Sequence, residues 1–274
     1  DGFLYNNMGA GTGTKIVGSG YSKNKMLSYF FRTNYILKDR YYLTATLRSD
    51  GASVFAKNHK WGYFPSVALG WTVTEEDFMK KYDWMSMLKL RLSWGQTGNS
   101  DIGTNAFASY SAAPAYNRAD KSQIIGVFPS KLENPDLKWE TTTEWNIGLD
   151  MGFLNNRILA SVEFYHKIVS DLLNYNPLNF YHDVSKVMAN VGKTQSTGIE
   201  VTINTRNIDT KDFKWTTDFT FTKYKDRWKE RTPDWKPGVY EKVDDPIRPI
   251  YSRLADHILQ IGEKVPAVTL ILDN

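Results

Sequence analysis

The feature that most constrains this chain is a two-residue alternation of apolar and polar side chains. It is clearest in residues 41–71, which read YYLTATLRSDGASVFAKNHKWGYFPSVALGW. There Leu43 and Leu47 alternate with Thr44 and Arg48. Because successive side chains of a strand point to opposite faces, the string predicts strands with one apolar and one polar face. A soluble sheet can carry this pattern, and so can a barrel wall between lipid and water.

The same alternation predicts eight strands. We expect them near residues 29–37, 41–50, 66–74, 88–94, 139–151, 158–167, 199–204 and 215–222. Short or moderate links, at 38–40, 75–86, 154–157 and 206–212, take turns with long ones, at 51–60, 96–138, 172–188 and 226–257. Long and short links therefore lie at opposite edges of the sheet. This layout is typical of an antiparallel up-and-down transmembrane β-barrel and not of a Greek-key sandwich.

One local motif interrupts the strand pattern. Residues 74–77 read Thr-Glu-Glu-Asp and resemble a capping box, with Thr74 as the cap and Asp77 three residues later. The motif predicts a short helical turn before Asp83. Its acidic residues are interpreted as part of the cap and not as a catalytic site.

Composition agrees with a barrel wall and excludes several other classes. Aromatic residues make up 14% of the chain, as expected for strands and for the aromatic girdles of membrane barrels. No run of about eighteen apolar residues indicates a transmembrane helix. The net charge of +4, without a basic block, gives no reason to expect nucleic acid as a partner. The absence of Cys excludes disulfides and thiolate metal sites.

No motif indicates catalysis, a cofactor or a resident metal. The string GAGTGTK lacks the spacing of a Walker loop and of the dinucleotide fingerprint. The four His residues are scattered without H-E-x-x-H spacing, and no Ser lies in a G-x-S-x-G elbow. We therefore expect a protein that is not an enzyme.

The charged residues of the predicted strands fall on their polar faces. A wall that lines a wet lumen or contacts a plug needs such paired polar groups, which explains them without catalysis. We expect nine of these side chains to face a lumen: Arg32, Arg48, Asp50, Arg91, Glu144, Asp150, Glu163, Glu200 and Asp218. On the apolar faces, Trp71, Trp94, Trp145 and Trp215 are expected to form an interfacial girdle.

Five ordered strings carry a resemblance to a known family. They are YYLTATLRSDGASVF, WGYFPSVALGWTVTEEDFM, LKLRLSWGQTGN, NPDLKWETTTEWNIGLD and NVGKTQSTGIEVTI. Together they resemble the SusC/RagA family of TonB-dependent outer-membrane transporters from Bacteroidetes-type bacteria. The resemblance implies a large barrel with an N-terminal plug, energised through the TonB complex. It also implies a SusD-like surface lipoprotein as a lid, and import of oligosaccharides or peptides.

The resemblance also bears on how much of a barrel is present. Plugged transporters have about 22 strands, against the eight expected here. We therefore expect residues 1–274 to be a later part of the barrel domain, without the plug and the TonB-binding segment. An isolated piece would leave two unpaired sheet edges, although a closed barrel of eight strands is geometrically possible.

Three aromatic residues in the last long link are candidates for contact with cargo. Trp228, Trp235 and Tyr240 lie in residues 226–257, which the barrel layout places outside the cell. Their rings could stack on a sugar. The alternative is that they pack within the loop or on the lid partner.

Two other functional classes stay open at this point. One is an outer-membrane barrel with a structural or adhesive role and no transport. The other is a secreted glycan-binding β protein, which would be soluble without detergent. An upstream plug in the full reading frame would favour the transporter.

Overall fold

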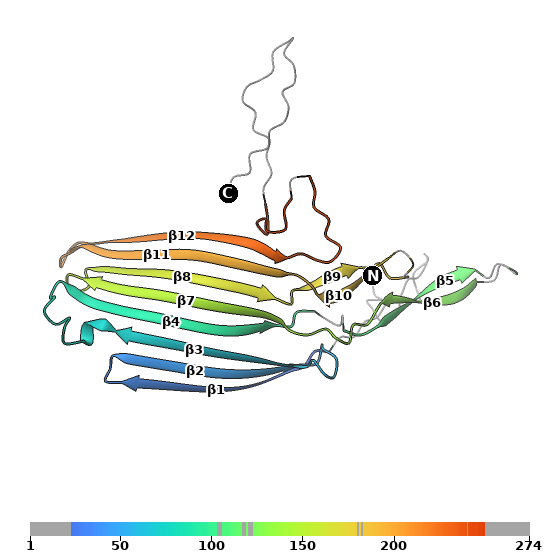
Figure 1. Cartoon of the computed structure of the whole chain (residues 1–274), viewed down its shortest axis with the longest axis horizontal. Coiled ribbons are helices and arrows are strands. Elements are labelled where there is room, and N and C mark those ends of the chain that lie inside the picture. The colour runs from blue at the N-terminus through green and yellow to red at the C-terminus, as the bar shows by residue number, and fades with distance from the viewer. Residues whose placement is uncertain are drawn as a thin grey trace, which may run out of the picture.

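The computed structural model describes residues 23–102, 106–116, 119, 123–179, 181, 183–239 and 241–249. In these residues, eight long strands form one sheet, and two short hairpins lie at one end of it (Figure 1). The long strands are β1 (Met26–Leu37), β2 (Tyr41–Ala52), β3 (Trp61–Thr72), β4 (Met85–Asn99), β7 (Glu140–Phe153), β8 (Ile158–Ser170), β11 (Lys193–Asp209) and β12 (Lys214–Glu230).

The sheet is an antiparallel meander, in the order β1-β2-β3-β4-β7-β8-β11-β12. All eight predicted strands are present, so the expected all-β, up-and-down arrangement is confirmed. The sheet is open: β1 and β12 lie at its two edges, and the closed barrel of eight strands does not form. Most strands are longer than the alternation predicts, because pairing continues past the last apolar residue.

Tight turns join the strands at one end of the sheet. Lys38 and Asp39 both have φ near +50°, at 53° and 52°, and Arg40 N donates to Leu37 O at 3.2 Å. Two consecutive left-handed residues suit the right-handed twist of a two-residue hairpin. The turn between β7 and β8 likewise uses positive φ, at residues 154–156. The short links predicted at 38–40 and 154–157 are therefore confirmed, whereas the link predicted at 206–212 spans only 210–213, because β11 continues to Asp209.

The long connections at the opposite end contain structure that the sequence pattern missed. The predicted loop 96–138 holds the hairpin β5 (Ser109–Tyr116) and β6 (Gln123–Lys131). The predicted loop 172–188 holds most of the hairpin β9 (Leu173–Pro177) and β10 (Lys186–Asn190). Both hairpins lie beyond the end of the main sheet (Figure 1). Long and short connections therefore occupy opposite ends, as expected.

The predicted capping box is wrong. A single 3-10 turn covers Val73–Glu75, its cap is Thr72, and no side chain caps it. Thr74 lies inside the turn, where its hydroxyl accepts a 3.4 Å hydrogen bond from Leu88 N on β4. Thr74 is thus committed to the neighbouring strand and is not free to cap the turn.

The pairing register separates the two faces of the sheet. Residues directly opposite each other point to the same face. One row therefore crosses seven strands on one face: Tyr35, Leu43, Leu69, Leu92, Ile147, Phe164 and Ile199. We call this the apolar face. Leu69 is 49% exposed and Ile147 50% exposed, so nothing in the described residues covers it.

The opposite side, here called the polar face, carries a row of a different kind. From β1 to β12 it consists of Arg32, Thr46, Ser66, Gly95, Glu144, Lys167, Ser196 and Asp226. The row contains only charged, hydroxyl and small residues. The two-sided pattern predicted from residues 41–71 therefore extends across the sheet, except that Lys223 of β12 lies opposite Ile199 on the apolar face.

The buried core lies at the end of the sheet with the long connections. We call it the loop-end cluster, and it consists of Ala52, Val54, Phe55, Phe64, Ile102, Ala106, Leu137 and Trp139. Phe55 and Leu137 are fully buried. The Trp139 ring lies 5.2 Å from that of Phe55 and 5.5 Å from that of Phe64, and its indole N–H donates to Lys60 O at 3.1 Å. This core ties three separate connections to the sheet.

Candidate functional site

The nine charged residues predicted to face a lumen all lie on the polar face. Arg32 and Glu144 belong to the row described above, and strand alternation places Arg48 and Asp50 beside them. A second row places Arg91 opposite Gly148, then Glu163 and Glu200. Asp150 and Asp218 fall on the same side by alternation. That this face meets a lumen stays a prediction.

Arg91 is the centre of a charged network on this face. Its guanidinium donates to both oxygens of Asp150, at 2.7 and 2.8 Å, and to Glu163 at 2.6 Å. Ser161 donates to Asp150 at 2.9 Å, and Asn146 donates to Glu163 at 3.4 Å. Bidentate contact between arginine and a carboxylate is among the stronger polar interactions in proteins. The network links β4, β7 and β8 without leaving a catalytic group free.

Arg91 reaches Glu163 because the residue between them is glycine. Gly148 lies directly opposite Arg91 on β7, and a Cβ there would lie 2.9 Å from the Arg91 Cζ. The guanidinium thus crosses the backbone of β7 to the next strand. Alternation along β7 puts Gly148 on the same face as Glu144 and Asp150, but the sequence pattern does not show that it makes room for Arg91.

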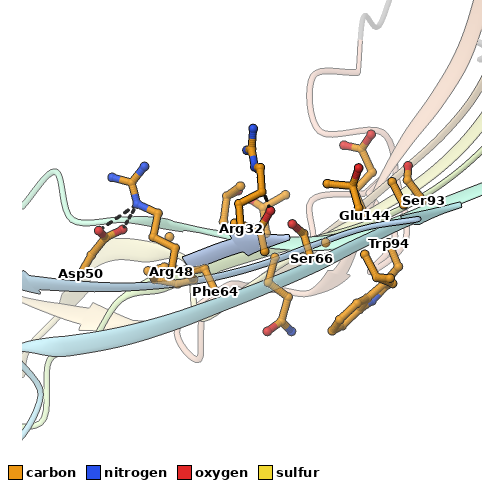
Figure 2. A pocket seen from close by; sticks show the side chains of 17 residues that line it. Arg32, Arg48, Asp50, Phe64, Ser66, Ser93, Trp94 and Glu144 are labelled. Carbon is orange, nitrogen blue, oxygen red and sulfur yellow. Dashed lines mark hydrogen bonds and ion pairs between the residues drawn. The ribbon is translucent and has the colours of Figure 1, made fainter. Parts of the chain in front are cut away.

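A hollow of about 740 Å³ lies on the polar face, nearer the long connections. Its floor consists of short side chains, including Thr46, Ser66, Ala68 and Ser93. Arg32, Arg48 and Asp50 lie at one side and Glu144 at the other, and Figure 2 shows these side chains standing off the sheet. Hydroxyl and charged groups around an open hollow suit a polar ligand or a polar protein surface.

Two of the three candidate aromatic residues come together. Trp228 lies near the end of β12 and not in a loop, because pairing with β11 continues to Glu230. The guanidinium of Arg231 lies 4.9 Å from the Trp228 ring centroid and 4.7 Å from that of Trp235. Packing within the segment therefore accounts for both rings, while contact with cargo stays a prediction. Tyr240 lies outside the described residues.

The four tryptophans expected in a girdle lie on the apolar face. Register places Trp71, Trp94 and Trp145 there, and alternation along β12 places Trp215 there. The Trp94 and Trp145 rings are neighbours at 6.0 Å. No helix in the described ranges is long and apolar enough to cross a membrane.

A polar clasp at the short-turn end was missed by sequence reasoning. The Glu76 carboxylate accepts hydrogen bonds from Arg40 at 2.8 Å, from the Tyr41 hydroxyl at 2.6 Å and from the Trp71 indole at 3.1 Å. The pKa of Glu76 is lowered, mainly because the hydrogen bonds from Tyr41 and Trp71 stabilise its ionised carboxylate. The alternation could not reveal this clasp, because Glu76 lies between strands.

The described residues contain no group of three or more His, Asp or Glu side chains placed to hold a metal ion. His59 lies 4.0 Å from Asp136, and His166 shares a hydrogen bond with the Thr197 hydroxyl at 2.9 Å. The chemistry offered by the polar face is thus hydrogen bonding and charge pairing.

Comparison with known proteins gives matches along most of the chain. A family model described as TonB dependent receptor-like, beta-barrel matches residues 1–249. The TonB-dependent receptor SusC of Bacteroides thetaiotaomicron is 40% identical over 213 residues, which are 73% of this chain and 20% of that protein. The TonB-dependent receptor P3 of Formosa agariphila is 36% identical over 224 residues, 81% of this chain and 22% of that protein.

Solved structures agree with the sequence matches. The structure of the RagAB peptide transporter superposes with a TM-score of 0.75 and 25% identity, covering 93% of this chain and 29% of that one. The RagAB peptide importer in its closed-closed state gives a TM-score of 0.69 and 27% identity, covering 84% of this chain and 26% of that one. The chain spans about a fifth of the length of the curated relatives that it matches.

Proposed function

Since this chain belongs to the family of TonB-dependent receptor β-barrels, which lie in the outer membrane, we propose that its sheet is one sector of the wall of an importer. In this proposal residues 1–274 supply barrel strands only. The plug and the segment that contacts TonB belong to other parts of the same protein. The two edge strands, β1 and β12, then pair with further strands of that barrel.

The observation that carries the proposal is the contrast between the two faces of one sheet. The apolar face exposes large side chains in row after row, whereas the polar face carries charged side chains, among them Arg91, which pairs with Asp150 and Glu163. A wall between lipid and an aqueous lumen needs this combination. The nine charged residues named above then line the lumen or contact the plug.

The connections give the wall an orientation. Outer-membrane barrels have short periplasmic turns and longer extracellular loops. The loop-end cluster and both small hairpins therefore lie on the cell surface, and the Glu76 clasp lies at the periplasmic side. A SusD-like lipoprotein would cover the surface end, in keeping with the relatives named SusC and RagAB.

The proposed mechanism is gated passage without bond chemistry. Oligosaccharide or peptide cargo is held between the surface loops and the lid, and it moves inward when the TonB complex remodels the plug. Trp228, Trp235 and Tyr240 are the proposed surface contacts with cargo. Support for peptide cargo comes from the solved relative described as a peptide transporter, and support for glycan cargo comes from the resemblance to the SusC family.

The test is an in-frame deletion of the full gene, followed by growth and uptake on defined oligosaccharides and peptides. We expect loss of uptake of one class, with the protein in the outer-membrane fraction. Normal uptake of every class together with lost adhesion would favour an adhesive barrel. Recovery of the protein in the medium without detergent would favour a secreted binding protein.

A further inference from the structure

The hollow on the polar face contains an arginine that is held in position by a buried carboxylate. The Nε of Arg48 donates to both oxygens of Asp50, at 2.8 and 2.7 Å. Asp50 is only 6% exposed, whereas the Arg48 side chain is 53% exposed. Asp50 thus fixes one edge of the guanidinium. Figure 2 shows its terminal amino groups standing above the hollow.

A second arginine lies beside it in a similar way. The Nε of Arg32 donates to the Thr46 hydroxyl at 3.1 Å. Arg32 is directly opposite Thr46, so Arg48 is its diagonal neighbour, at about 7–8 Å, with the Cβ atoms somewhat closer. Among the described residues, no hydrogen bond or ion pair reaches the terminal amino groups of either arginine. Two oriented guanidinium groups are therefore available on the same side of the hollow.

Asp50 offsets one of the two positive charges, because it is ion-paired with Arg48, and the other carboxylate lining the hollow is distant. The floor on β3 and β4 is built from small residues, Ser66, Ser93 and Gly95 among them. Glu144 lies in the same row as Arg32 but four strands away, which is about 19 Å at 4.8 Å per strand. That separation exceeds the screening length of about 8 Å at physiological salt. Glu144 therefore does not neutralise the two arginines.

The position of the hollow along the strands favours cargo over plug. Asp50 lies two residues before the end of β2, at the side of the long connections. The Arg91 network lies in the other half of the sheet, and its charges are already paired. With the long connections outside the cell, the hollow belongs to the outer half of the lumen, where cargo first enters.

We propose that Arg32 and Arg48 form a subsite for an anionic group, a carboxylate in particular, on the cargo. The proposal rests on the proposed function, because it takes the polar face to be the lumen. A carboxylate can accept two parallel hydrogen bonds from one guanidinium fork, and the second arginine adds charge and direction. Asp50 is a positioning residue, since it acts through Arg48.

The test uses the purified full-length receptor with its surface partner. It is incubated with two pools, one of C-terminally amidated tetrapeptides and one of neutral and uronate-containing oligosaccharides, and retained species are identified by mass spectrometry. We expect members with a carboxylate to be enriched over neutral members by about tenfold in one pool, as charge-assisted hydrogen bonds permit. The pool that shows the enrichment identifies the source of the carboxylate.

Two variants address the arginines separately. Arg32→Gln removes an exposed charge without disturbing Asp50. Arg48→Lys keeps a charged partner for Asp50 but loses the guanidinium group that can donate two parallel hydrogen bonds to a carboxylate. Both are expected to reduce the enrichment severalfold while retention of neutral members stays unchanged. Arg206→Gln is the matched control, because Arg206 is an exposed arginine at the short-turn end, and it should retain the enrichment.

The outcomes separate this subsite from the import proposal. No enrichment in the wild-type receptor, or enrichment that survives both variants, overturns the subsite. If enrichment by the purified receptor depends on Arg32 and Arg48, the subsite is supported. If the deletion strain nevertheless keeps normal uptake, import is overturned. If uptake is impaired in the deletion strain but the purified receptor does not enrich members with a carboxylate, only the subsite is overturned.

Discussion

At the scale of single residues, Gly148 decides whether three strands share one charged network. Ala at this position would put its Cβ 2.9 Å from the Arg91 Cζ, so Arg91 must withdraw from Glu163. We expect Gly148→Ala to lower the free energy of unfolding by about 1 kcal/mol, because the flexible Arg91 side chain moves aside and gives up its charge-assisted hydrogen bond to Glu163. Urea unfolding of the purified receptor in lipid vesicles measures this.

Gly70→Ala is the matched control for that prediction. Gly70 also lies on the polar face, but a Cβ there meets Lys89 Cε and Tyr42 Cβ at 3.4 Å, which is ordinary contact. It should unfold close to the wild type. Equal destabilisation by both changes would show that Arg91 does not depend on the missing side chain of Gly148.

Neighbouring residues on β2 test the assignment of the two faces. Leu43 lies on the apolar face and Thr44 on the polar face, where the Thr44 hydroxyl donates to Asn34 at 2.8 Å. Leu43→Arg places a charge in lipid and should cost about 2–4 kcal/mol of folding free energy near the midplane. Thr44→Arg should cost less, because its side chain reaches water. Unfolding in vesicles compares the two, and equal costs would contradict the assignment.

The Glu76 clasp predicts a pH dependence. The pKa of Glu76 is lowered in the folded protein, so its ionised form stabilises the fold above the unfolded pKa of about 4.3. This contribution is lost as the pH falls from there through the folded pKa. Glu76→Gln should therefore flatten the loss of stability in thermal unfolding below about pH 5. Glu75→Gln is the control, since Glu75 lies in the same turn but takes no part in the clasp, and a result like that of Glu76→Gln would discount the clasp.

At the scale of elements, the loop-end cluster holds the long connections to the sheet. Phe55→Ala removes a fully buried ring and should cost about 3–5 kcal/mol. The damage should be local, so limited proteolysis should open the connection between β2 and β3 first. Phe107→Ala is the control, because Phe107 is exposed in the same region. Unchanged protease resistance after Phe55→Ala would mean that the cluster does not secure these connections.

The connections also provide a test of orientation. These 274 residues contain no Cys, so a single introduced thiol is a clean target here. On intact cells, a membrane-impermeant maleimide should label Lys57→Cys, between β2 and β3, and should leave Asp39→Cys, in the turn between β1 and β2, unlabelled. Labelling of both only after outer-membrane permeabilisation, or the reverse pattern, would contradict the proposed orientation. The unsubstituted receptor gives the background.

Strand-forming signals in the sequence are local, and this explains what could be predicted. Alternation along one segment was enough to place β2 and to separate Leu43 from Arg48. The hairpin of β5 and β6 escaped because its strands are rich in small residues and contain Pro114, and β9 and β10 have five residues each. The loop-end cluster escaped because Phe55 and Leu137 are far apart in the chain.

The candidate site shows the same division. The side of the sheet that carries Arg32, Arg48 and Asp50 follows from alternation alone. The hydrogen bonds from Arg48 to Asp50, and the crossing of Arg91 over Gly148, depend on side-chain geometry that no pattern of residue types contains. The continuation of β12 through Trp228 depends on pairing with β11, which alternation in one strand does not report.

At the scale of the whole molecule, the sheet is a surface without a core of its own. Apart from the loop-end cluster, its large apolar side chains are exposed on one face, and both edge strands lack a partner in the described residues. Lipid and neighbouring strands of a larger barrel would satisfy both needs. We therefore expect residues 1–274 expressed alone to aggregate, and the full receptor in detergent to remain monodisperse. Size-exclusion chromatography compares them, and a stable soluble monomer of residues 1–274 would contradict this view.

The register of the apolar face also sets the angle at which this wall crosses the membrane. Leu37 is the last apolar residue of β1 at the short-turn end. The row of directly paired residues that starts at Leu37 ends at Phe221 on β12. On β12 the apolar face continues for six more residues, to Trp215. The lower limit of the apolar face therefore shifts by about 20 Å along the strands from β1 to β12, at 3.4 Å for each of six residues. Over the same seven strand steps the sheet extends about 34 Å sideways, at 4.8 Å per step. The strands must lean by about 30° from the membrane normal, close to the tilt of 35–45° that closed barrels adopt. The stagger between neighbouring strands that a complete barrel needs in order to close is thus already present in this one sector.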